Sequence, residues 1–109
     1  MLSIKLWVDD TRPAPNDGTL WWLAWSVNEA KRFIEGFEKG IVTPFGKFDL
    51  IDIDHDAGDY VKDGGDFIKL LDWLEQTGRN YPIRIHTMNP VGAENMRKII
   101  RKNGWKEVV

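Results

Sequence analysis

Short apolar segments alternate with helical segments along the whole chain, and this alternation is the feature that most constrains its fold. Strand-like periodicity occurs in residues 3–9, 20–25, 48–54, 82–87 and 105–109. Between these segments, apolar residues recur at helical spacing. Strands that alternate with helices of about 10–15 residues form βα units on a parallel sheet. We therefore predict a single α/β domain over residues 1–109, with a parallel five-stranded sheet flanked by helices.

The helices have clear boundaries in the sequence. Ser26 is followed three residues later by a glutamate, which forms a capping box, and the helix that starts there should end at Gly40. The next two helices should end at Gly78 and near Gly104. Residues 11–18 contain two prolines and a glycine, so we expect a loop and not a helix between the first two strands.

Composition excludes several classes of function. The 109 residues carry a formal net charge of −2 and no cysteine. This charge gives no general attraction to nucleic acid or to an anionic membrane, and the lack of cysteine excludes disulfides, thiolate metal sites and a cysteine nucleophile. No apolar segment approaches the ~20 residues that span a bilayer, and the first residues lack the apolar region of a signal peptide. We expect a cytoplasmic protein that does not bind membranes.

Polar residues gather where the predicted strands end, which is where an open parallel sheet binds its ligands. They are Asp9 and Asp10 after the first strand, Asp54, His55 and Asp56 after the third, and His86, Thr87 and Asn89 after the fourth. Carboxylates that converge without a cation repel one another, whereas a hard divalent cation prefers oxygen ligands. We therefore expect a divalent metal ion bound by Asp9, Asp10, Asp54 and Asp56. Mg²⁺ is the first choice, with Mn²⁺ or Ca²⁺ as alternatives.

Other aspartates nearby have simpler explanations. Asp49, Asp59, Asp63 and Asp66 are expected to satisfy backbone donors in loops and caps. The spacing from Asp52 onward is similar to an EF-hand calcium loop, but alanine stands at its sixth position, aspartate at its twelfth, and a strand precedes it. We reject that interpretation.

Both histidines of the chain follow strands at this edge, and histidine is the usual proton carrier near neutral pH. We expect His55 and His86 to move protons during a reaction. Arg12 can hold an anion with its bidentate fork, and Thr87 can donate a hydroxyl to a phosphate oxygen. Asn89 begins a helix whose N-terminus attracts anions.

Three tryptophans, Trp21, Trp22 and Trp25, are crowded into the second predicted strand. We expect them to belong to the core. The alternative is that one exposed indole stacks on a nucleic-acid base.

The order of the polar residues resembles that of a response-regulator receiver domain, the chemotaxis-protein-Y-like fold. Asp9-Asp10 is similar to the acidic pair of receivers, Asp54 to the phospho-acceptor, and Thr87 to the hydroxyl residue after strand four. The resemblance implies a flavodoxin-like fold, here with the first helix replaced by a loop and the fifth helix absent. It permits Asp54 to act as a nucleophile that forms an aspartyl-phosphate. It leaves open whether Lys106 corresponds to the lysine that follows strand five in receiver domains.

Three motifs more closely resemble a receiver-derived family proposed to process cyclic phosphates. They are Asp9-Asp10-x-Arg12-x-x-Pro15, Asp54-His-Asp56 and His86-Thr-x-Asn89. This resemblance implies a metal-dependent phosphoesterase that acts on a phosphodiester or cyclic phosphate, with a phosphate-containing small molecule or nucleotide as its partner. The alternative is a non-catalytic receiver-like module that binds a nucleotide or a protein partner.

Overall fold

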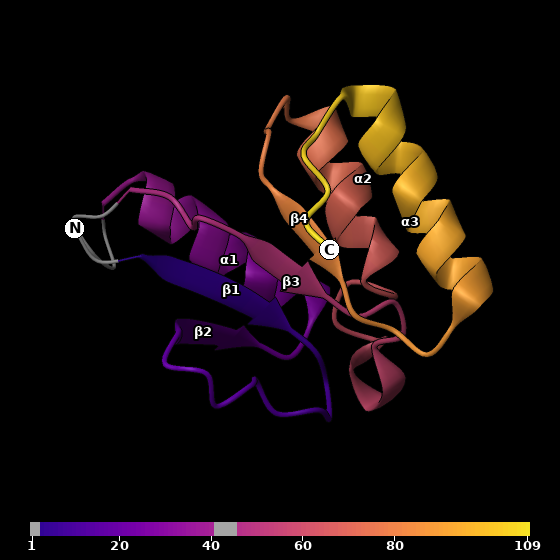
Figure 1. The fold of residues 1–109 in the computed structure, drawn as a ribbon, viewed down its shortest axis with the longest axis horizontal. Coiled ribbons are helices and arrows are strands. Elements are labelled where there is room, and N and C mark those ends of the chain that lie inside the picture. The colour runs from indigo at the N-terminus through magenta and orange to yellow at the C-terminus, as the bar shows by residue number, and fades with distance from the viewer. Residues whose placement is uncertain (1–2, 41–45) are drawn as a thin grey trace.

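The computed structural model describes residues 3–40 and 46–109, and in this part of the chain it shows an α/β fold with a four-stranded sheet. Residues 1–2 and 41–45, which the predicted domain includes, lie outside the described residues. The strands are β1 (Ile4–Val8), β2 (Leu20–Ala24), β3 (Ile51–Ile53) and β4 (Ile83–Ile85), in the order β2-β1-β3-β4 (Figure 1). All neighbouring strands pair in parallel. Their carboxyl ends therefore lie at one edge, as the alternation of segments predicts.

Three helices accompany the sheet: α1 (Val27–Glu38), α2 (Ile68–Gln76) and α3 (Pro90–Asn103), with a short 3-10 turn, η1 (Gly58–Tyr60). The predicted cap of α1 is confirmed, because the Ser26 hydroxyl accepts a hydrogen bond from the Glu29 N–H at 3.1 Å. The Glu29 carboxylate in turn accepts from the Trp25 N–H at 2.7 Å. α3 ends where Gly104 adopts a left-handed conformation with φ of 67°, which glycine accommodates without steric cost.

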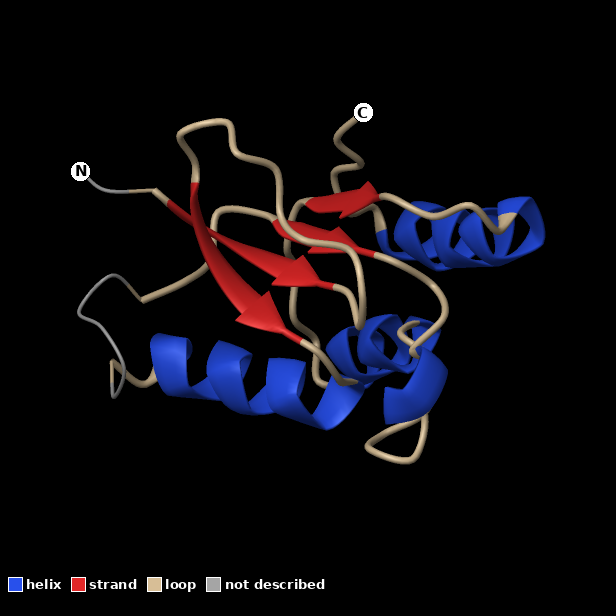
Figure 2. Cartoon of the chain, turned by 90° about the horizontal axis from the view of Figure 1, so that it is seen from below, coloured by secondary structure: helices blue, strands red, loops and turns tan. Residues whose placement is uncertain are grey.

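The apolar core lies between the sheet and the helices. Alternate residues of β1, namely Ile4, Leu6 and Val8, are buried in this core together with residues of α1 and α2. Helices α1 and α2 lie on one side of the sheet, and the connection of residues 9–19 crosses the other side without forming a helix (Figure 2). No helix in the described ranges has the length and apolar character needed to cross a membrane.

The predicted fifth strand over residues 105–109 is wrong. This segment forms one isolated parallel bridge, between Glu107 and Ile83. The Ile83 N–H donates to the Lys106 carbonyl at 2.9 Å, and the Val108 N–H donates to the Ile83 carbonyl at 2.8 Å. β4 has only three residues, so it offers few further positions at which residues 105–109 could pair with it. Lys106 lies beside the start of β4, at the end opposite to the predicted site.

Candidate functional site

Three carboxylates converge at the carboxyl edge of the sheet. Asp9 and Asp10 follow β1 and Asp54 follows β3, and one oxygen from each lies within 4.8 Å of the others. The parallel pairing of β1 with β3 brings them together, since the Asp54 N–H donates to the Val8 carbonyl at 3.0 Å. Hard divalent cations bind oxygen at about 2.0–2.6 Å, so one ion can reach all three residues. The donor set therefore fits a cation such as Mg²⁺.

Asp9 is the most tightly held of the three. Its Oδ1 accepts hydrogen bonds from the Thr11 and Arg12 N–H groups at 2.9 and 2.8 Å, and its Oδ2 lies 2.8 Å from His86 Nε2. Burial acts to raise the pKa of Asp9, but these hydrogen bonds outweigh it and hold the pKa below its ordinary value. Asp9 is therefore an ionised and well-oriented carboxylate, and a candidate ligand for a cation.

Asp10 has the opposite electrostatic setting. Burial raises its pKa, and the neighbouring charges of Asp9, Asp54 and Asp59 raise it further. Gly58, at φ of 54°, leaves the space that this carboxylate occupies, because a Cβ there would collide with Asp10 Oδ2. Negative charge crowded in this way is relieved by a bound cation.

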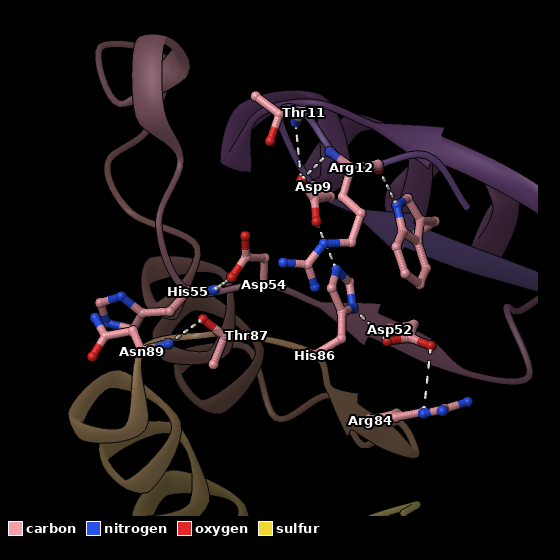
Figure 3. A network of polar contacts seen from close by, with 11 residues as sticks. Asp9, Thr11, Arg12, Asp52, Asp54, His55, Arg84, His86, Thr87 and Asn89 are labelled. Atoms are coloured by element: carbon pink, nitrogen blue, oxygen red, sulfur yellow. Dashed lines mark hydrogen bonds and ion pairs between the residues drawn. The ribbon is translucent and has the colours of Figure 1, made fainter. Parts of the chain in front are cut away.

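His86 is clamped between two carboxylates (Figure 3). Its Nδ1 lies 2.6 Å from Asp52 Oδ1 and its Nε2 lies 2.8 Å from Asp9 Oδ2. The imidazole also stacks on Trp7, with ring centroids 3.8 Å apart and planes 4° from parallel. Each ring nitrogen therefore faces a carboxylate oxygen, and both nitrogens are engaged within the protein. The predicted role of His86 in proton transfer stays a prediction, and this geometry favours a role in orienting Asp9.

Sequence reasoning missed Asp52 and Trp7 as members of this network. Asp52 is 1 % exposed within β3, and its Oδ2 lies 3.9 Å from Arg84 Nε. The Trp7 indole N–H donates to the Arg12 carbonyl at 2.8 Å and so holds the loop after β1 against the sheet. A carboxylate in the middle of an apolar strand was the available signal for Asp52, since such a group needs a partner when buried. Nothing in the sequence set Trp7 apart from a core residue.

His55 lies against the start of α3. Its Nδ1 is 2.7 Å from Asp56 Oδ1, and its backbone N–H donates to Asp54 Oδ1 at 2.7 Å. Its ring packs on Gly92, where a Cβ would lie 2.5 Å from His55 Cγ. Asp56 thus contacts His55, and it does not belong to the group of converging carboxylates found among the described residues, where we expected it. The Asp56 contact engages Nδ1, so Nε2 is the ring nitrogen that this contact leaves free.

The predicted phosphate-binding residues lie on the loops that follow β1 and β4 at the carboxyl edge of the sheet. The Arg12 side chain extends across the site toward Asp54 and His86 (Figure 3), and it takes part in none of the arginine ion pairs found in the described ranges. Thr87 Oγ1 accepts from the Asn89 N–H at 3.2 Å. The Asn89 side chain caps α3 by accepting from the Gly92 N–H at 3.0 Å.

Two of the four aspartates that we assigned to loops and caps accept hydrogen bonds, Asp66 from a backbone N–H as predicted and Asp63 from side chains. Asp63 accepts from the Ser26 hydroxyl at 2.6 Å and from the Asn28 side chain at 3.2 Å. Asp66 accepts from the Ala57 N–H at 3.1 Å. These contacts hold the loop after β3 on the N-terminus of α1, and so help to place Gly58 beside Asp10.

Comparison with known proteins gives one match. Residues 4–102 match the family model of the cyclic-phosphate processing receiver domain. No curated protein and no solved structure shows significant similarity to the chain. The matched range runs from β1 into α3 and contains all three converging carboxylates, both histidines and Arg12. The chain therefore belongs to the family of cyclic-phosphate processing receiver domains.

Proposed function

We propose that this domain is a metal-dependent phosphoesterase that hydrolyses a cyclic phosphate or another phosphodiester. The convergence of Asp9, Asp10 and Asp54 within 4.8 Å carries the proposal. All the donors are carboxylate oxygens, and their mutual repulsion favours a doubly charged ion, with Mg²⁺ the first choice. When bound, such an ion supplies Lewis-acid polarisation of a phosphoryl oxygen.

Binding of the phosphate group falls to residues around the carboxylates. The Arg12 guanidinium carries a positive charge into an otherwise acidic site, and its planar fork suits two phosphate oxygens. The Thr87 oxygen accepts from the Asn89 N–H, so its own O–H is the group that it can donate to a phosphate oxygen. The N-terminus of α3 adds a favourable field for the anion. A phosphate-containing small molecule or nucleotide is the partner that this set of groups suits.

His55 is the residue that we assign to proton transfer. Hydrolysis of a phosphodiester needs a base to take a proton from water and an acid to protonate the leaving oxygen as the P–O ester bond breaks. The carboxylate of Asp56, 2.7 Å from Nδ1, holds the imidazole with that nitrogen protonated and with Nε2 as the exchanging atom. In the second form of the mechanism, an oxygen of Asp54 attacks phosphorus while the P–O ester bond breaks and the leaving oxygen takes a proton from His55. Water then cleaves the bond between phosphorus and the Asp54 oxygen and so releases the phosphate and the free carboxylate.

His86 acts as a positioning residue in this scheme. Its contacts with Asp9 and with the buried Asp52 fix the orientation of the Asp9 carboxylate. Mutation of a residue that orients a metal ligand typically lowers metal affinity or activity by about 10–100-fold.

The same observation favours the second candidate function, a non-catalytic module that binds a nucleotide or a protein. Both ring nitrogens of His86 contact carboxylates, which leaves His55 as the one candidate for proton transfer among the two histidines at this edge. A domain that retains phosphate binding without turnover would fit this arrangement.

Hydrolysis assays separate the two functions. The protein is incubated with a nucleoside 2′,3′-cyclic phosphate and with a linear phosphodiester, in Mg²⁺, in Mn²⁺ and in chelator. We expect turnover that requires the metal and that falls at least about 10–100-fold in Asp54→Asn. Asp49→Asn is the matched control, because Asp49 is exposed and precedes β3 at the opposite end of the strand.

The outcomes are distinct. Absence of turnover under every condition, with phosphate binding intact, would support the binding module over the enzyme. Equal activity of Asp54→Asn and Asp49→Asn would show that the converging carboxylates do not form the reaction centre.

A further inference from the structure

A cavity of about 260 Å³ opens next to the carboxylates, between the loop after β1 and the end of β2. Its walls include Trp7, Asp9, Asp10, Arg12, Leu23 and Trp25. The polar part of the wall therefore belongs to the proposed metal and phosphate site, while the rest is apolar and aromatic. A ligand held at the carboxylates by its phosphate has this cavity as a neighbouring place for its organic part.

Two apolar residues of the cavity wall are about half exposed to solvent. Trp25 is 52 % exposed and Leu23 is 47 % exposed, and neither belongs to the apolar core of the described residues. The Trp25 backbone is held by its hydrogen bond to the Glu29 carboxylate at 2.7 Å. A half-exposed indole on a backbone that is held in place provides a platform on which a flat ring can stack.

A second aromatic ring lies beside the first. The centroid of Tyr60 is 6.0 Å from that of Trp25, with 53° between the ring planes, and Tyr60 is 38 % exposed. Tyr60 ends η1, which begins at Gly58 beside Asp10. The end of β2 and the loop after β3, which lie beside the carboxylates, thus each lead to an exposed aromatic side chain.

The volume of the cavity and the net charge of the chain restrict the class of ligand. Ligand sites for drug-sized molecules usually occupy about 300–1,000 Å³, so a cavity of about 260 Å³ suits one nucleoside-sized group. A net charge of −2 gives the chain no general attraction to the polyanionic backbone of a nucleic acid. These features suit a mononucleotide better than an oligonucleotide.

We propose that the cavity receives the base of a nucleoside phosphate, which stacks on Trp25 while its phosphate group binds beside Asp9, Asp10 and Asp54. This inference rests on the proposed function and names the substrate class of the same site. It assigns to Trp25 the recognition of the base, and it separates nucleoside phosphates from phosphodiesters that lack an aromatic ring.

The test compares two probes in calorimetric titrations with Mg²⁺: adenosine 2′,3′-cyclic phosphate and methyl riboside 2,3-cyclic phosphate, which lacks the base. Wild type should bind the base-bearing probe at least about 10-fold more tightly, since stacking on one aromatic side chain typically contributes that much or more. Trp25→Ala should remove this advantage and leave binding of the base-free probe within about 2-fold of wild type. Trp25→Phe should retain part of it.

Leu20→Ala is the matched control, because Leu20 is 50 % exposed on β2, the strand that Trp25 follows, and does not line the cavity. It should bind both probes as wild type does. Thermal unfolding of each variant checks that the fold is intact.

Equal binding of the two probes to wild type overturns the inference, whether or not either probe is hydrolysed. An equal loss of affinity for both probes in Trp25→Ala also overturns the inference, because that result indicates a structural role for Trp25. Absence of binding of either probe to wild type overturns it too. Preferential, Trp25-dependent binding of the base-bearing probe without turnover supports the inference and contradicts the phosphoesterase. Hydrolysis of both probes, bound with equal affinity, supports the phosphoesterase and contradicts the inference.

Discussion

The substitution Gly92→Ala sets two effects against each other at the start of α3. Gly92 is the third residue of this helix, a position at which alanine ordinarily stabilises by about 1 kcal/mol relative to glycine. A Cβ here would lie 2.5 Å from Cγ and 2.7 Å from Cδ2 of His55. Overpacking of that kind ordinarily costs about 1–3 kcal/mol. We therefore expect a net loss of about 0–2 kcal/mol in the free energy of unfolding.

A double-mutant cycle isolates the clash from the helical effect. His55→Ala removes the ring atoms that the new Cβ would meet. In that background Gly92→Ala should stabilise the protein by about 1 kcal/mol, which makes the coupling between the two sites about 1–3 kcal/mol. Urea unfolding followed by tryptophan fluorescence measures all four proteins. Hydrolysis of a cyclic phosphate should also fall in Gly92→Ala, because the displaced ring loses its alignment with Asp56.

One result would refute this reasoning. If Gly92→Ala stabilises the protein equally with and without the His55 ring, the two residues are not in contact, and Gly92 is not needed to place the imidazole.

Two further predictions concern buried charges. Asp52→Asn removes the charge that His86 Nδ1 faces at 2.6 Å, and it should lower the free energy of unfolding by about 1–3 kcal/mol in urea titrations; unchanged stability would contradict the network. Glu38 is the second case: burial acts to raise its pKa, but hydrogen bonds from Arg79 and Tyr81 and the Arg79 charge outweigh it and lower the pKa below 4.5. A lowered folded-state pKa contributes stability above the unfolded pKa, and that contribution is lost as pH falls through the folded value. Wild type should therefore lose more stability than Glu38→Gln as the pH falls below about 4.5, and parallel pH profiles of unfolding would contradict this.

Much of the fold follows from local patterns in the sequence. Alternating apolar segments predict parallel strands, and the capping box at Ser26 and the glycines at 40, 78 and 104 predict where helices begin and end. These features depend on neighbours a few residues apart, so a single sequence contains them. The number of strands was the error, since residues 105–109 have strand-like composition but form only the bridge at Ile83.

The convergence of Asp9, Asp10 and Asp54 could also be anticipated from the sequence. Parallel strands end at the same edge, and neighbouring strands lie only about 4.8 Å apart, so residues that directly follow β1 and β3 must be close together. Backbone pairing alone therefore places these three carboxylates.

The partner of each polar side chain, by contrast, is decided only by tertiary packing. His86 contacts residues 34 and 77 positions away in the chain, and no local pattern indicates that both of its nitrogens are taken. Asp56, an expected ligand, contacts the His55 ring and does not belong to the converging carboxylates found in the described part of the chain. The cavity beside Trp25 likewise exists only where the loop after β1 meets the end of β2. Strand ends define which residues share the site, whereas rotamers and loop packing define what each of them can do there.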